Sequence, residues 1–108
     1  LCENPIGAEI ERILTMASES KSVMEETLSQ FESQQADERE KIKPYVVFQK
    51  ELFRIYLELS SLHNADLGDS ENTAITDAEN ELEQMLVEAA KSVHATSIPL
   101  HEQKRLNV

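Results

Sequence analysis

The chain has 108 residues and a formal net charge of -11, from 21 acidic and 10 basic side chains. Its length predicts one domain. Its acid excess repels phosphate groups, which disfavours nucleic acids and anionic membrane surfaces as partners. Charges interrupt every apolar run well short of the ~18 residues that a membrane span needs.

Cys2 is the single cysteine, so no intramolecular disulfide is possible and a reducing compartment fits best. We therefore expect a cytoplasmic location, with a nuclear one as the alternative. Because the chain begins with Leu1, we also expect it to be part of a longer protein. Gly and Pro are scarce, whereas Leu, Glu and Ala are abundant, which is typical of helical proteins.

The first predicted helix covers residues 5–34. Asn4 and Pro5 suit its N-cap and first position. Apolar residues then recur at spacings of three and four, in one narrow stripe: Ile6, Ile10, Ile13, Leu14, Ala17, Met24, Leu28 and Phe31. A narrow stripe indicates a helix on the outside of a bundle or in a coiled-coil seam.

The apolar pattern lapses between Glu32 and Lys43, and Pro44 disfavours helical geometry at the residue before it. We therefore predict a hairpin within residues 33–43. The alternative is one long helix kinked near Pro44, whose first stripe continues through Ile42, Val46, Phe53 and Leu57 and serves oligomerisation. The hairpin is preferred because a continuous helix leaves the main apolar face of the next segment uncovered.

That segment, residues 44–65, is the predicted central helix. On a helical wheel it has one broad apolar face: Tyr45, Phe48, Leu52, Ile55, Tyr56, Leu59 and Leu62. Val46, Phe53 and Leu57 form a second, narrower stripe. The two together span about twice the ~100° that a surface helix usually buries, so this helix needs two neighbours. The second stripe is covered either by the third helix or by a partner protein.

A polar linker follows, in which Gly68 can take a positive φ, and then a third helix over residues 72–94. Thr76 and Glu79 have capping-box spacing, although the helix could begin earlier. Its apolar stripe contains Ile75, Ala78, Leu82, Met85, Leu86, Ala89 and Val93. Its acidic residues lie in the first half, where the helix dipole favours them. Residues 95–108 are predicted to be a tail or linker.

Nothing in the sequence indicates catalysis. Gly7 and Gly68 are too far apart to build a phosphate-binding loop. The three histidines lack metal-ligand spacing. An acidic segment, residues 66–77, lacks the Gly and the final Glu of a calcium-binding EF-hand loop. We therefore predict no enzyme activity, no cofactor and no metal site.

The sequence as a whole predicts an all-α fold, an antiparallel up-down-up three-helix bundle with coiled-coil-like packing over residues 1–94. The expected function is protein–protein interaction, as a scaffold, an adaptor or an assembly segment of a larger protein. The predicted contact residues are Val46, Phe53 and Leu57, with Glu79, Glu81 and Glu83 as an acidic guide for a basic protein partner. Self-association into a homo-oligomer is the alternative to such a partner. The alternatives are an oligomerisation segment built on the long kinked helix, or a helical domain of an enzyme whose active site lies elsewhere.

Overall fold

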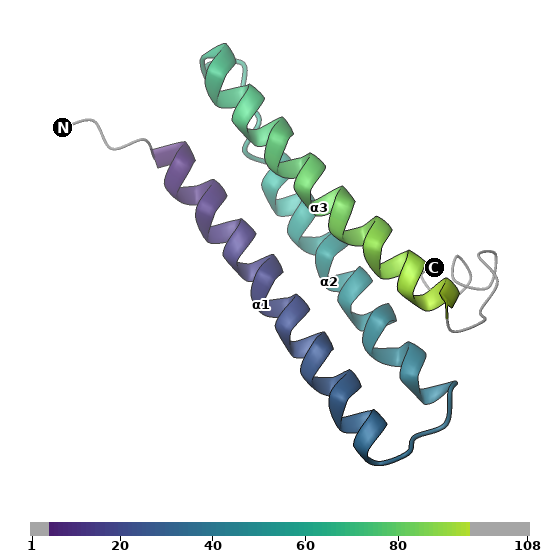
Figure 1. Cartoon of the computed structure of the whole chain (residues 1–108). Coiled ribbons are helices and arrows are strands. Elements are labelled where there is room, and N and C mark those ends of the chain that lie inside the picture. The colour runs from purple at the N-terminus through teal and green to yellow at the C-terminus, as the bar shows by residue number, and fades with distance from the viewer. Residues whose placement is uncertain (1–4, 96–108) are drawn as a thin grey trace.

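The chain folds into three long helices and one short 3-10 helix, seen here in a computed structural model that describes residues 5–95 (Figure 1). The elements are α1 (Pro5–Ser33), η1 (Glu40–Ile42), α2 (Lys43–Ser60) and α3 (Asp69–Ala95). Successive helices run in opposite directions, and the described residues contain no strand. The predicted antiparallel three-helix bundle is confirmed. The predicted tail, residues 95–108, lies outside the described residues except for Ala95.

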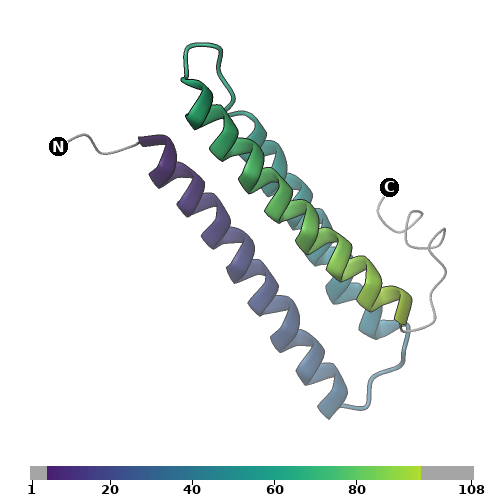
Figure 2. The same cartoon turned by 45° about the horizontal axis from the view of Figure 1, so that its top comes forward.

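The α2 helix is central to the core. Both α1 and α3 pack against it, whereas α1 and α3 contact each other less (Figure 2). The predicted broad face of α2 is buried as expected, with Leu52, Ile55 and Leu59 fully inaccessible to solvent. Facing them are core residues from the other two helices: Ile10, Ile13, Ala17, Met24, Ile75, Ala78, Leu82 and Ala89.

The chain reverses direction between α1 and α2, so the hairpin prediction is correct and the long kinked helix is wrong. A pair of backbone hydrogen bonds ends α1: Ala36 N–H donates to Phe31 O at 2.9 Å, and Gln35 N–H donates to Glu32 O at 3.1 Å. This is the Schellman pattern. It places Gln35 at a positive φ of 52°. Lys41 then pairs with Glu32 at 3.1 Å and ties the connection back to the end of α1.

Replacing Gln35 with Gly is expected to stabilise the protein by up to about 1 kcal/mol. A side chain at positive φ crowds its own backbone, and Gly removes that conflict at the cost of a more flexible unfolded chain. Gln34→Gly is the matched control, because Gln34 has no positive φ and only the flexibility cost applies. Urea unfolding of both variants gives the comparison. Equal destabilisation by both would contradict the assigned backbone conformation.

The α2–α3 turn differs from the prediction in several details. The α2 helix ends at Ser60 rather than near residue 65, and α3 begins at Asp69 rather than 72. Gly68 has no positive φ. The N–H of Gly68 instead donates to the Glu71 carboxylate at 3.4 Å, one half of a capping box at the start of α3.

The pairing of Thr76 with Glu79 as a capping box is also wrong. Thr76 lies two turns inside α3, and its hydroxyl donates to the Asn72 carbonyl at 3.2 Å. An N-cap hydroxyl would face free N–H groups, and within a helix those groups are already bonded. The side chain of Glu79 has a different role, in the turn between α2 and α3.

Candidate protein-binding surface

An apolar surface is exposed where α2 and α3 meet on the side away from α1. Phe53 is 58% exposed and Leu57 52%, and on α3 Val87 is 46% exposed. Val46, the third residue of the predicted stripe, is half-buried. A groove of about 690 Å³ follows this surface, here called the α2/α3 groove; its lining is Gln49, Lys50, Phe53, Leu86, Val87 and Ala90.

The pairing of the two helices explains why these side chains meet. The Ser60 hydroxyl donates to the Glu79 carboxylate across the α2–α3 contact. Because the helices are antiparallel, the residue seven positions before Ser60 lies opposite the residue seven positions after Glu79. Phe53 therefore faces Leu86, and both line the groove. Leu52, one residue away and turned by about 100°, points into the core and is fully buried.

Of the residues that line this groove, the sequence identified Phe53 on α2 as a contact residue but missed the α3 side. Val87 is apolar and lies outside the predicted stripe of α3, which was the available signal. Lys50 also lines the groove, is exposed, and has no ion-pair partner among the described residues. Val47 and Val23 are 65% and 63% exposed, but they lie at the α1–α2 contact, on the other side of α2.

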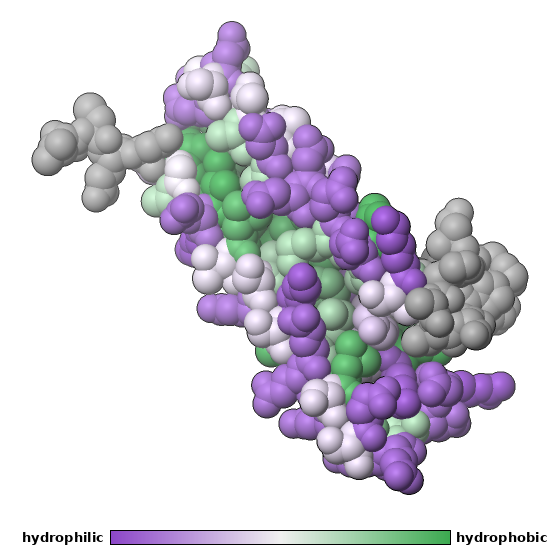
Figure 3. Space-filling model, in the orientation of Figure 1, coloured by the Kyte–Doolittle hydropathy of each residue, from purple (hydrophilic) through white to green (hydrophobic). Residues whose placement is uncertain are grey.

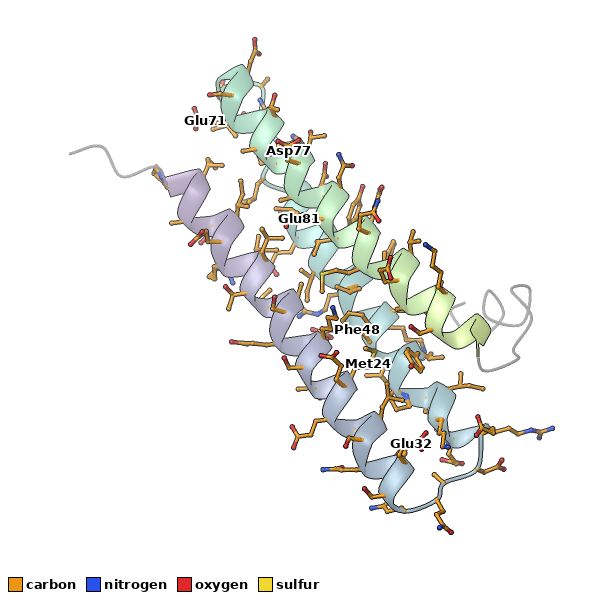
Figure 4. The ribbon with its side chains drawn as sticks, in the orientation of Figure 1. Met24, Glu32, Phe48, Glu71, Asp77 and Glu81 are labelled. Atoms are coloured by element: carbon orange, nitrogen blue, oxygen red, sulfur yellow. The ribbon has the colours of Figure 1, made fainter. Side chains whose placement is uncertain are left out.

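The three acidic residues predicted to guide a partner do not form one surface. Glu81 and Glu83 are both exposed, but two residues along a helix correspond to a rotation of about 200° around its axis, so the two side chains point to nearly opposite sides. Figure 4 labels Glu81 along α3 together with Glu71 and Asp77. Glu83 is one turn before Val87 and so lies on the side of the α2/α3 groove. Glu79 is half-buried and points into the turn between α2 and α3.

A polar network joins α2 to α3 at that turn. His63 Nε2 lies 3.1 Å from a Glu79 carboxylate oxygen, and His63 Nδ1 lies 3.2 Å from Asn72 Oδ1. The Asn72 amide nitrogen donates to the Asn64 carbonyl at 3.1 Å, which fixes its oxygen toward His63. Both ring nitrogens thus face acceptors, and only a protonated imidazole donates to both.

Both partners in the His63–Glu79 pair have shifted pKa values. The pKa of His63 is raised, first by its hydrogen bond to Glu79 and then by that to Asn72. Burial works against ionisation of Glu79, but hydrogen bonds from Ser60 and His63 outweigh it and lower the pKa of the carboxyl. The two groups therefore favour a charged pair at neutral and mildly acidic pH.

These shifts predict how stability depends on pH. The contribution of His63 is fully present below about pH 6.5, its unfolded pKa, and is lost as the pH rises through its higher folded pKa. The contribution of Glu79 is present above its unfolded pKa of about 4.3 and is lost as the pH falls through its lower folded pKa. The network is therefore expected to stabilise most between about pH 4.5 and 6.5.

Thermal unfolding from pH 4 to pH 9 measures this dependence in the parent chain and in His63→Gln. The gap in Tm should be widest near about pH 5–6 and should narrow in more alkaline buffer. In a Glu79→Gln background the substitution at His63 should lose most of that pH dependence, since the carboxylate is the main cause of the shift. A gap that stays constant across the range would show that the charged pair does not form.

The described residues contain no group of three His, Cys, Asp or Glu side chains arranged to hold a metal ion. Among them, no helix has the length and apolar character needed to cross a membrane. No protein-family model matches the chain, and no curated protein or solved structure matches it either.

Proposed function

We propose that this chain is a non-enzymatic protein–protein interaction module that binds a helix of a partner protein in the α2/α3 groove. The observation that carries the proposal is the exposure of Phe53 and Val87, which both line this groove, together with Leu57 one helical turn beyond Phe53 on α2. Single exposed apolar residues are common on protein surfaces, whereas a contiguous group marks an interaction site. A helix is the natural occupant, because apolar residues at helical spacing fill such a groove between two helices.

Apolar contact, rather than charge, is the main source of affinity in this proposal. Fully burying an exposed Phe or Leu side chain is worth roughly 1.5–3 kcal/mol. Around the groove, Lys50 and Glu83 have opposite charges, so the groove favours neither a strongly basic nor a strongly acidic partner. A cytoplasmic or nuclear location belongs to the same proposal, supported by the single cysteine in the sequence.

Phe53→Ser tests the proposal, and Val47→Ser is its matched control. Both replace a well-exposed apolar side chain of α2 with Ser, but only Phe53 lines the α2/α3 groove. We expect Phe53→Ser to weaken partner binding about 10- to 100-fold, the equivalent of the burial energy of one side chain. Val47→Ser should leave binding unchanged. Binding is measured by quantitative enrichment of partners from cell extract, with titration of the partner found.

Self-association is measured on the same variants by sedimentation velocity at several concentrations. If the parent chain forms dimers that Phe53→Ser dissociates and Val47→Ser does not, the partner is a second copy. Equal loss of binding in both variants, or in neither, would place the binding surface elsewhere on the molecule.

A further inference from the structure

A second groove lies on the opposite side of the bundle core, between α1 and α3. Its volume is about 400 Å³, and its apolar lining is Met24, Leu28, Tyr45, Phe48, Met85 and Ala89. It is here called the α1/α3 groove. Figure 3 shows an apolar strip along the line between α1 and α3, and Figure 4 shows Met24 and Phe48 close together in this region. The groove arises because α1 and α3 both pack on α2 and contact each other less.

The groove is lined by apolar side chains that pack on the core, and the three helices leave some of these side chains partly exposed. Phe48 is 2% exposed and forms part of the floor, whereas Leu28, Tyr45 and Met85 are half-buried. Two of the three methionines, Met24 and Met85, line the groove. Methionine is flexible and polarizable, and it adapts to different apolar partners. A fourth helix placed here would complete a four-helix arrangement around the same core.

The rim of the α1/α3 groove is acidic. Glu25 of α1 lines the groove, is exposed and has no ion-pair partner among the described residues. Glu81 of α3 is not a lining residue, but it is exposed, lies one turn before Met85 on the same side of α3, and likewise has no ion-pair partner among the described residues. Glu88 lies two turns beyond Glu81 on the same side of α3, and within the part of the chain that the structure describes its only ion pair is an exposed one with Lys91 at 3.9 Å. Such a pair is worth little. Among the described residues, Lys21 is the one cation that lines the groove.

We propose that the α1/α3 groove binds a basic amphipathic helix of a partner protein. Its apolar stripe would cover Leu28, Tyr45 and Met85, and Lys or Arg residues beside that stripe would reach Glu25, Glu81 and Glu88. Charge also argues against a second copy as the occupant. The chain has a net charge of -11, and it has no Lys or Arg from Ile55 to Ala90. Two such surfaces repel each other.

This site is separate from the α2/α3 groove in both position and chemistry. The sequence suggested one surface with an apolar stripe and an acidic guide. In the structure the apolar stripe, with Phe53, lies on one side of α2, while Glu81 and Glu88 border the groove on the other side of α3. The two sites can therefore be tested independently.

The experiment uses two synthetic peptides of about 18 residues, or five helical turns. They share one Leu and Ala stripe and differ only in having Lys or Glu beside it. We expect the Lys peptide to bind the whole chain at least about tenfold more tightly than the Glu peptide in fluorescence anisotropy, with affinity falling as salt rises. Amide chemical shifts should change at Leu28, Tyr45 and Met85.

Substitutions in the chain show where the Lys peptide binds. Glu81→Gln with Glu88→Gln should weaken binding of the Lys peptide about 2- to 20-fold, since each exposed charge pair contributes roughly a 1.5- to 5-fold effect. Glu83→Gln is the control for each of the two single substitutions, because it removes one negative charge from the opposite side of α3 and should have no effect. Met85→Lys should abolish binding by filling the groove with a charge. Phe53→Ser should leave binding unchanged.

Circular dichroism of each variant establishes that it is folded, and the Gln substitutions are all at exposed positions. The proposal is overturned if neither peptide binds, if both bind equally, or if the shift changes fall at Phe53 and Val87. An equal effect of Glu83→Gln would also overturn it. If the parent chain forms dimers that Met85→Lys dissociates, the groove is an interface between two copies and the proposed basic partner is wrong.

Discussion

Truncating Leu52 to Ala is expected to lower the free energy of unfolding by about 2–5 kcal/mol, whereas Phe53→Ala should lower it by less than about 1 kcal/mol. Leu52 is fully buried between α1 and α3, so its loss removes apolar burial and leaves a cavity. Phe53 is the larger side chain but is 58% exposed, so little of its surface leaves water on folding. Of these two adjacent residues, Leu52 is therefore expected to affect mainly stability and Phe53 mainly binding.

Urea unfolding at low protein concentration measures both values, and similar slopes in the two variants would show that the same surface is exposed on unfolding. The measurement is repeated at tenfold higher concentration to detect association. If Phe53→Ala costs as much as Leu52→Ala at every concentration, the chain itself covers Phe53 and the α2/α3 groove is not open. A cost that appears only at high concentration would indicate a second copy in the groove.

The helices and the core of this fold are readable from apolar periodicity. Leu52, Ile55 and Leu59 recur at three and four, and all three are fully buried. The hairpin is readable because the pattern lapses before Pro44 and because a continuous helix would expose that face. A pattern of this kind shows which side of each helix is covered by a neighbour. For three helices joined in sequence, that information is enough to predict a bundle.

The turns were less predictable, because their geometry depends on which residue falls at the helix end. Gly68 is a residue that can take a positive φ, yet the residue that has one in the structure is Gln35, two residues beyond α1. Nothing in the chemistry of Gln favours that conformation. Asp69 and Glu71 extend α3 by a turn, because acidic side chains are favourable at a helix N-terminus.

Half of the candidate site was likewise visible in the sequence. Phe53 and Leu57 lie out of phase with the core-facing residues of α2, and out-of-phase apolar residues are a signal of a second contact. Which residues of α3 lie opposite them depends on how the two antiparallel helices are aligned. That alignment is fixed by tertiary contacts such as Ser60 with Glu79, which no local pattern encodes.

Glu79 is a second residue whose contacts are not encoded by a local sequence pattern, and its contacts affect stability. In sequence it resembles Glu81 and Glu83, but in the structure its carboxylate accepts hydrogen bonds from Ser60 and His63, and its side chain is only 14% exposed. Glu79→Ala is expected to lower the free energy of unfolding by about 1–3 kcal/mol, since it leaves the hydrogen-bond donors of Ser60 and His63 without their charged acceptor. Glu83→Ala, at an exposed position, should change it by no more than about 0.5 kcal/mol.

The two Ala variants share the same change in helix propensity and the same loss of one negative charge, so their difference isolates the turn network. Glu79→Gln separates charge from hydrogen bonding, because the amide oxygen still accepts from Ser60 while the attraction to a protonated His63 is lost. Its destabilisation should therefore fall between those of the Ala variants near pH 6. Urea unfolding at that pH gives all three values. An equal effect of Glu79→Ala and Glu83→Ala would mean that the polar network contributes nothing to holding α3 against α2. Apolar packing alone would then set the alignment of the two helices on which the α2/α3 groove depends.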